Sequence, residues 1–85
     1  MEEVVLLGED AYLIKGTAEM EDVLAFLELE EEAEYPDTLS AFLINRLGYV
    51  PRPGQAPEVP YQGYLFRAEE VSGGLIRTVR VQKMR

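Results

Sequence analysis

The segment from Thr38 to Gln55 constrains the fold most, because it encodes both a helix and the way the chain leaves it. Apolar residues recur at the i, i+3, i+4, i+8 spacing of one helical face, at Leu39, Phe42, Leu43 and Leu47. Gly48 is suited to the left-handed conformation of a helix C-cap, and Pro51 and Pro53 exclude any continuation. The segment therefore predicts an amphipathic helix that ends at about Gly48, but it does not indicate any chemical activity.

The first third of the chain predicts a hairpin followed by a helix. Val4–Leu7 and Ala11–Ile14 are short apolar runs on either side of a turn that contains Gly8. A helical stripe follows at Met20, Val23, Leu24 and Leu27. Thr17 is the expected N-cap of this helix, and Asp37 or Thr38 is the expected N-cap of the next one. The intervening residues, Glu28 to Tyr35, lack a helical pattern and predict an acidic loop.

The last third predicts a second hairpin. Tyr61–Ala68 and Leu75–Met84 are rich in β-forming residues, and Ser72-Gly73-Gly74 lies between them as a turn. Residues Tyr49–Pro60 contain four of the five prolines, which indicates a structured connector or an edge strand. The whole pattern predicts one α+β domain spanning residues 1–85, with two helices packed on a mainly antiparallel sheet of about five strands.

Charge and composition exclude several classes of function. The chain has 85 residues, a formal charge of −8 and no cysteine, and no apolar run approaches the ~20 residues of a membrane span. Such a charge repels nucleic acid, so no nucleic-acid partner is expected. The acids gather in the first half and the bases near the C-terminus, which would allow attraction within one fold or between two copies. Individually, most of these charges are expected to be solvated.

Side chains for covalent catalysis are missing. The sequence contains no histidine and no cysteine, so neither a Ser-His nor a Cys-His nucleophile pair can form. Phosphate-binding glycine motifs are absent as well. No enzymatic activity and no cofactor are therefore expected.

Two ligand sites remain as alternatives to a surface without ligands. The acidic loop offers hard oxygen ligands for Mg²⁺ or Ca²⁺, at Glu30, Glu31, Glu34 and Asp37, although a solvated charge run explains the same residues. Arg77 and Arg80 of the last strand could bind a nucleotide-like anion. Basic residues also protect edge strands from pairing with other chains, and we favour this role for them.

The order of several short motifs carries a family resemblance. These motifs are Thr38-Leu39, Leu43, Leu47-Gly48-Tyr49-Val50-Pro51 and Gly54-Gln55, flanked by Tyr12–Gly16 and by Gly63-Tyr64-Leu65-Phe66. Their order resembles the "Thr-Leu…Gly-x-Ile-Pro-x-x-Gly-Glu" core of the CorC/HlyC transporter-associated domain, over about residues 3–83. The chain departs from that pattern at Ser40-Ala41, where the family has a Gly, and at Gln55, where it has a Glu.

The resemblance implies a fold and a setting. The family's fold resembles the small α+β part of FAD-binding oxidase domains, and no catalytic residue is known for it. In hemolysin-like proteins linked to magnesium and cobalt efflux, the domain follows a transmembrane region and a pair of CBS domains. The resemblance thus implies a regulatory or accessory domain on the cytoplasmic side of the bacterial inner membrane. Its partners would be the neighbouring CBS and transmembrane domains, and a homodimer through the basic hairpin or an exposed helix face is a further expectation.

Overall fold

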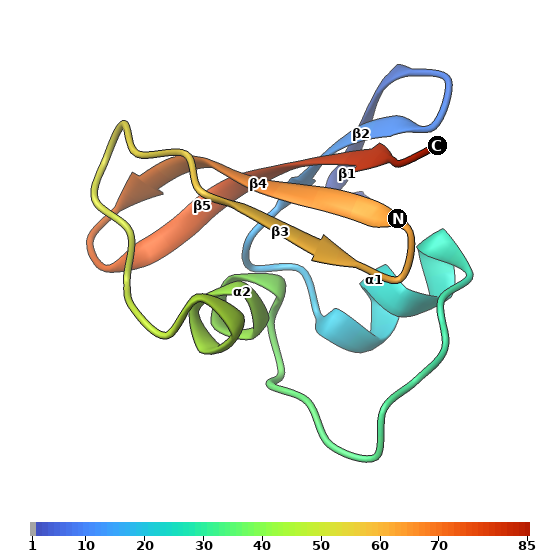
Figure 1. Cartoon of the computed structure of the whole chain (residues 1–85), viewed down its shortest axis with the longest axis horizontal. Helices are drawn as coiled ribbons and strands as arrows, with labels where there is room; N and C mark the ends of the chain where they lie inside the picture. Colours follow the sequence, from blue (N-terminus) through green and yellow to red (C-terminus); the bar gives the residue numbers. More distant parts are fainter. Residues whose placement is uncertain (1) are drawn as a thin grey trace.

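The computed structural model describes residues 2–85, which form one five-stranded sheet and two helices (Figure 1). The elements are β1 (Val4–Gly8), β2 (Ala11–Lys15), α1 (Met20–Leu27), α2 (Leu39–Leu47), β3 (Glu58–Tyr61), β4 (Tyr64–Ser72) and β5 (Leu75–Lys83). The strand order is β1-β2-β5-β4-β3, and every neighbouring pair is antiparallel. The predicted α+β fold is confirmed.

Both helices lie on the same side of the sheet, and the core fills the space between the two layers (Figure 1). The largest fully buried side chains come from both helices and from three strands: Phe66, Ile14, Met20, Leu24, Leu39, Leu43, Ile76, Val23, Val79 and Val81. The predicted last hairpin is formed by β4 and β5, and Phe66 and Val81 are buried and oppose each other across it. Within residues 2–85, neither helix combines the length and the apolar content that a membrane crossing requires.

The position of β5 corrects one prediction. Its basic residues were expected to protect an edge strand, but β5 is the central strand of the sheet. It pairs with β2 on one side, where Leu13 opposes Arg80, and with β4 on the other, where Arg67 opposes Arg80. Val79 and Val81 are buried and Arg80 between them is exposed, so Arg80 lies on the face of the sheet that the helices leave uncovered. The edges of the sheet are β1 and β3.

The two helices begin differently. Thr17 is not the N-cap of α1: the cap residue is Glu19, which has an extended backbone and makes no side-chain capping bond. Thr38, one of the two predicted candidates, caps α2, because its hydroxyl oxygen accepts a hydrogen bond of 3.1 Å from the Ala41 N–H. At the other end, Gly48 has φ 82° and its N–H donates to the Ile44 carbonyl oxygen, which confirms the predicted helix stop.

Replacing Thr38 by Ala should therefore destabilise the domain, whereas replacing Thr17 by Ala should not. Thr38→Ala leaves a helix N–H without its acceptor and is expected to lower the free energy of unfolding by about 1 kcal/mol. Thr17 is exposed and supplies no such bond, so Thr17→Ala should stay within about 0.5 kcal/mol of the original protein. Urea denaturation of both variants measures the difference, and equal stabilities would contradict the assignment of the cap.

The connector from Tyr49 to Pro60 ends in the short edge strand β3. This strand forms a tight hairpin with β4, which was not predicted, because Tyr61 was assigned to the arm that follows the turn. The turn is Gln62-Gly63, whose positive φ angles of 45° and 82° are typical of a hairpin turn. Tyr61 consequently lies at the end of β3, beside the start of β4.

The loop after β2 lies very close to the backbone of β5 at Gly16. A Cβ atom on Gly16 would lie 1.7 Å from the carbonyl oxygen of Ile76, so only glycine fits. The Gly16 carbonyl oxygen accepts a hydrogen bond from the Ser40 N–H, and the Ser40 hydroxyl accepts one of 2.9 Å from the Ile76 N–H. Ser40 is buried, and this pair of bonds joins α2 to both the loop and β5.

Candidate functional site

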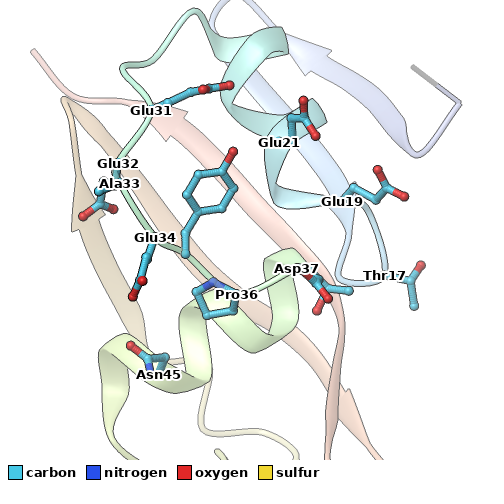
Figure 2. A pocket seen from close by; sticks show the side chains of 12 residues that line it. Thr17, Glu19, Glu21, Glu31, Glu32, Ala33, Glu34, Pro36, Asp37 and Asn45 are labelled. Atoms are coloured by element: carbon cyan, nitrogen blue, oxygen red, sulfur yellow. The ribbon is translucent and has the colours of Figure 1, made fainter.

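An acidic depression lies between the starts of both helices and the loop that joins them (Figure 2). Its volume is about 1140 Å³. Half of its lining residues are acids, and none is basic: Thr17, Glu19, Glu21, Glu31, Glu32, Ala33, Glu34, Tyr35, Pro36, Asp37, Thr38 and Asn45. A depression of this composition suits cations or polar surfaces rather than an apolar small molecule.

Three of the four predicted metal ligands line this depression, namely Glu31, Glu34 and Asp37. Glu30 does not, because its backbone is bonded to Gln62 at the β3–β4 turn. The carboxylates are spread around the rim rather than aimed at one point (Figure 2). In the described part of the chain, no three acidic side chains form a group that could hold a metal ion. Cation binding by these residues stays a prediction.

Tyr35 lies among the carboxylates of the depression. Burial raises the pKa of the Tyr35 hydroxyl above its ordinary value, and the neighbouring carboxylates of Glu31 and Glu21 raise it further. Glu21 comes from the first turn of α1, ten residues before Glu31 in the sequence. The fold thus adds the carboxylates of α1 to those of the loop, and the combined negative field favours cationic partners.

The acidic loop is anchored at its far side by the end of β3 and the turn that follows. The Tyr61 hydroxyl donates a hydrogen bond of 2.6 Å to the Glu32 carboxylate. The Gln62 side chain makes two bonds to the backbone of Glu30, donating to its carbonyl oxygen at 2.8 Å and accepting from its N–H at 2.9 Å. These contacts fix residues 30 and 32 of the loop against the end of β3 and its turn.

Arg46 supports this anchor from the last turn of α2. Its guanidinium carbon lies 4.7 Å from the centre of the Tyr61 ring and 5.4 Å from that of Phe42, in the geometry of cation–π contacts. The Phe42 and Tyr61 rings meet edge to face, with their centres 4.9 Å apart. The aromatic ring that carries the loop-binding hydroxyl is therefore fixed by contacts with α2.

Tyr61→Phe should lower the free energy of unfolding by about 1 kcal/mol at pH 7, since it removes one hydrogen bond. Burial, followed by the bond to Glu32, raises the pKa of Tyr61 above 10.0. The neutral hydroxyl is favoured in the folded state, so its contribution is fully present below pH 10 and is lost as the pH rises through the folded-state value.

Urea denaturation of both proteins at pH 7, 9 and 11 tests this expectation. The difference between the two proteins should be constant up to pH 9 and smaller at pH 11. Effects of the other tyrosines cancel because both proteins contain them. An equal difference at all three pH values would contradict the role of the Tyr61 hydroxyl.

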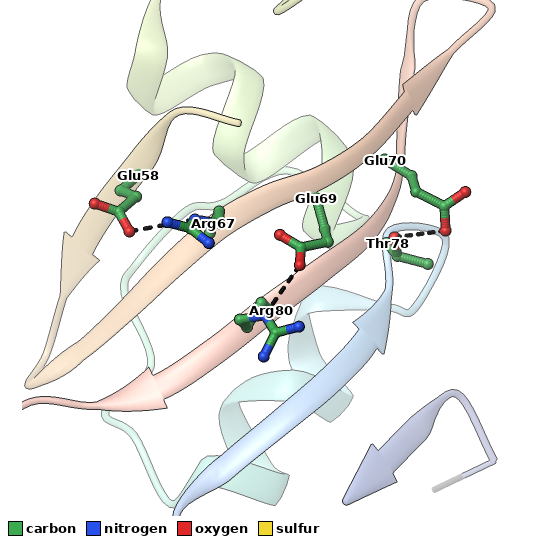
Figure 3. Close-up of polar contacts among 6 residues, drawn as sticks. All are labelled: Glu58, Arg67, Glu69, Glu70, Thr78 and Arg80. Carbon is green, nitrogen blue, oxygen red and sulfur yellow. Dashed lines mark hydrogen bonds and ion pairs between the residues drawn. The ribbon is translucent and has the colours of Figure 1, made fainter. Parts of the chain in front are cut away.

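The basic residues of the last hairpin form ion pairs on the uncovered face of the sheet (Figure 3). Arg80 lies 3.0 Å from the Glu69 carboxylate, and Arg67 lies 3.4 Å from that of Glu58. Arg77 donates a bond of 2.9 Å to the Ser72 hydroxyl. An anion at Arg77 and Arg80 would have to displace Glu69, so the geometry does not favour the nucleotide-like anion.

The residues that anchor the loop were not identified from the sequence. Tyr61 and Gln62 are 29 and 32 positions from the loop residues that they bind. The one available signal was the Gln62-Gly63 pair, which marks a turn after a short apolar run. Even that signal would predict the turn but not the loop that folds against it.

Comparison with known proteins agrees with the fold. The sequence profile of the family "Transporter associated domain" (CorC_HlyC) matches residues 6–85. A hemolysin domain from Enterococcus faecalis V583 superimposes with a TM-score of 0.90 at 23% identity, covering 98% of this chain and 99% of that one. A comparison with curated proteins finds no significant match.

Two further structures share the fold. One is a region associated with a candidate Mg²⁺ and Co²⁺ transporter (CorC) of Neisseria meningitidis MC58, with a TM-score of 0.85, 21% identity and coverage of 96% and 99%. The other is the CorC_HlyC domain of a Xylella fastidiosa Temecula1 hemolysin in complex with Mg²⁺ and Mn²⁺, with a TM-score of 0.82, 22% identity and coverage of 98% and 99%. With a family profile matched over nearly its whole length, this chain belongs to the CorC_HlyC family of transporter-associated domains.

Proposed function

We propose that this chain is a non-catalytic accessory domain of a CorC/HlyC-type divalent-cation transport protein. The observation that carries the proposal is the family match over residues 6–85. The absence of histidine and cysteine from the whole sequence supports a role without covalent catalysis. In this role the domain packs against neighbouring CBS and transmembrane domains on the cytoplasmic side of the membrane and adjusts transport of Mg²⁺ or Co²⁺.

Flux measurements on the parent protein test this role. The parent is reconstituted in liposomes with and without this domain, and Mg²⁺ and Co²⁺ flux is followed with a fluorescent indicator. We expect transport to persist without the domain, with a changed rate or a changed dependence on the cation concentration. Identical flux and identical concentration dependence would refute the proposal, and so would turnover of a substrate by the isolated domain.

A second candidate function is divalent-cation binding at the acidic depression. The favouring observation is that Glu31, Glu34 and Asp37 share one hollow, in a family whose Xylella fastidiosa member is seen in complex with Mg²⁺ and Mn²⁺. The spread carboxylates would hold a hydrated ion, mostly through its water molecules. Weak binding in the millimolar range is the expected result.

Titration with MnCl₂ and MgCl₂ tests this candidate. Mn²⁺ is paramagnetic and broadens the amide signals of residues near it, so NMR spectra of the domain locate the ion. A triple variant, Glu31→Gln, Glu34→Gln and Asp37→Asn, should abolish the broadening at the depression. The matched control, Glu2→Gln, Glu9→Gln and Asp10→Asn, removes the same charge elsewhere and should leave it unchanged. Equal effects of both variants would show that binding depends on net charge alone and would contradict a site in the depression.

Homodimerisation through the basic hairpin also remains a prediction. The attraction would come from the acidic half of one copy and the arginines of another, and it would weaken with salt. Sedimentation velocity at 20 mM and 500 mM NaCl measures it, and a strict monomer at low salt would count against it.

A further inference from the structure

One edge of the sheet lacks a neighbouring strand and is apolar. β1 is the first strand in the order β1-β2-β5-β4-β3, and only β2 pairs with it (Figure 1). Its three central side chains are exposed, with relative accessibilities of 57% for Val5, 70% for Leu6 and 42% for Leu7. Exposed edge strands of this composition readily pair with another strand.

The backbone groups that point outward from β1 follow from its register. The Lys15 N–H donates to the Glu3 carbonyl oxygen at 2.9 Å, and Val5 opposes Leu13. Since bonded and non-bonded pairs alternate in an antiparallel ladder, the N–H and C=O groups of residues 3 and 5 face β2. Those of Val4 and Leu6 consequently face away from the sheet and are available to a partner.

The opposite edge strand, β3, is protected from pairing with another strand, whereas β1 is not. β3 contains Pro60, which has no N–H to offer, and it carries Glu58, which is paired with Arg67. Within β1 there is neither a proline nor a charged side chain. The two edges of one sheet are thus built differently, and only β1 keeps a complete set of pairing groups.

Apolar side chains border β1 on both faces of the sheet. On the helix side, Leu6 opposes Tyr12, whose ring meets that of Phe26 edge to face with 5.1 Å between the ring centres. Phe26 is itself 40% exposed. On the uncovered side, Val5 opposes Leu13. A strand added to this edge would therefore cover apolar surface with both rows of its side chains.

The charges at the ends of β1 indicate the chemistry of the partner. Glu2 and Glu3 precede the strand, Glu9 and Asp10 follow it, and none of the four takes part in an ion pair within residues 2–85. We propose that β1 pairs with an extended segment of a partner protein that has an apolar β-forming centre flanked by lysine or arginine at both ends. A second copy of this chain would bring the same acids and a charge of −8, so it would be repelled. The inference stands independently of the transport role proposed above.

Binding of short labelled peptides tests the proposal. The probes are nine-residue peptides with five central residues drawn from Val, Ile, Tyr, Thr and Leu, flanked on each side by two lysines. A control set carries glutamates in place of the lysines. Fluorescence anisotropy measures affinity, and NMR spectra of the domain show which amides change. We expect binding by lysine-flanked peptides alone, signal changes at residues 4–7, and weakening by about fivefold between 50 and 500 mM NaCl.

Three variants assign the binding to β1. Leu6→Pro removes an N–H that faces away from β2, so it spares the ladder of the hairpin and should weaken binding about tenfold. Val5→Lys keeps every backbone donor and should weaken it through charge repulsion. Val50→Lys is the matched control, because Val50 is 47% exposed but lies in the connector after α2. It should change affinity less than about twofold, and circular dichroism verifies that all three variants fold.

Four results would overturn the proposal. They are equal affinity of the glutamate-flanked set, unchanged affinity of both β1 variants, absence of binding by every peptide at millimolar concentration, and self-association that Leu6→Pro removes. The last result would assign the edge to a second copy of the chain.

Discussion

Gly16→Ala should be the most damaging single-methyl change in this domain, lowering the free energy of unfolding by about 3 kcal/mol or more. The added Cβ would lie 1.7 Å from the Ile76 carbonyl oxygen and 2.8 Å from its carbonyl carbon, both of which belong to the backbone of the central strand. Ile76 is paired with Val71 of β4, so its backbone atoms cannot give way as the end of a flexible side chain could. An 85-residue domain has a total stability of about 4–13 kcal/mol, so this loss is a large part of it.

Thermal denaturation followed by circular dichroism measures the effect. At about 4–8 °C per kcal/mol, the melting temperature should fall by about 12 °C or more. Gly8→Ala is the matched control: a Cβ there meets no atom within 4 Å, and Gly8 has no positive φ. That variant should melt within about 3 °C of the original protein. A similarly small change for Gly16→Ala would show that the loop after β2 moves aside. The close approach of Gly16 to Ile76 would then contribute little to stability.

Local chemistry explains which elements could be predicted from the sequence. Thr38 and Gly48 mark the start and the end of α2, each through a hydrogen bond to a residue at most four positions away. The apolar stripe from Met20 to Leu27 depends only on helical spacing. The hairpins around Glu9-Asp10 and Gly73-Gly74 carry turn residues next to short runs of apolar or β-forming residues. All of these signals lie within about ten residues of the structure that they specify.

Strand order could not be predicted in the same way, because it depends on contacts between distant segments. β5 pairs with β2, which lies more than sixty residues earlier in the chain, and the sequence of neither strand indicates which strand will pair with it. Basic residues on β5 suggested an edge, but on a sheet with one uncovered face they are equally compatible with the centre. The missed cap of α1 has a similar origin: the Met20 N–H donates to the backbone of Asp37, which a reading of local sequence cannot detect.

Only the part of the candidate site that is contiguous in the sequence, within the acidic loop, was predicted. Glu31, Glu34 and Asp37 were identified because like charges follow one another in the loop. Glu19 and Glu21 join them only because α1 starts beside the loop's end. Glu30 was included for its charge, but its backbone is held at the β3–β4 turn by Gln62, which draws it away from the depression.

Ser40→Ala should lower the free energy of unfolding by about 2 kcal/mol, because it leaves a buried donor without an acceptor. The Ser40 hydroxyl accepts the Ile76 N–H at 2.9 Å and is 3% exposed. Alanine leaves the packing nearly unchanged and is a good helix former, so the loss reports the hydrogen bond rather than a cavity. Amide hydrogen exchange should show faster exchange at Ile76 specifically. Ser72→Ala, which removes an exposed hydroxyl bonded to Arg77, is the control and should cost less than about 0.5 kcal/mol.

Ser40→Gly tests whether the hydrogen bond between the Ser40 hydroxyl and the Ile76 N–H, rather than backbone contact, joins α2 to β5. The family pattern places a glycine near this position, and the chain instead has Ser40 at the start of α2 with Gly16 facing it. If the hydroxyl bond holds α2 to β5, Ser40→Gly should be less stable than the original protein by about 3 kcal/mol, since glycine adds a helix penalty of about 1 kcal/mol to the lost bond. A Ser40→Gly variant as stable as the original protein would mean that backbone contact alone joins the two elements. In that case the Gly16 carbonyl bond to the Ser40 N–H, which both variants retain, would be the contact that matters.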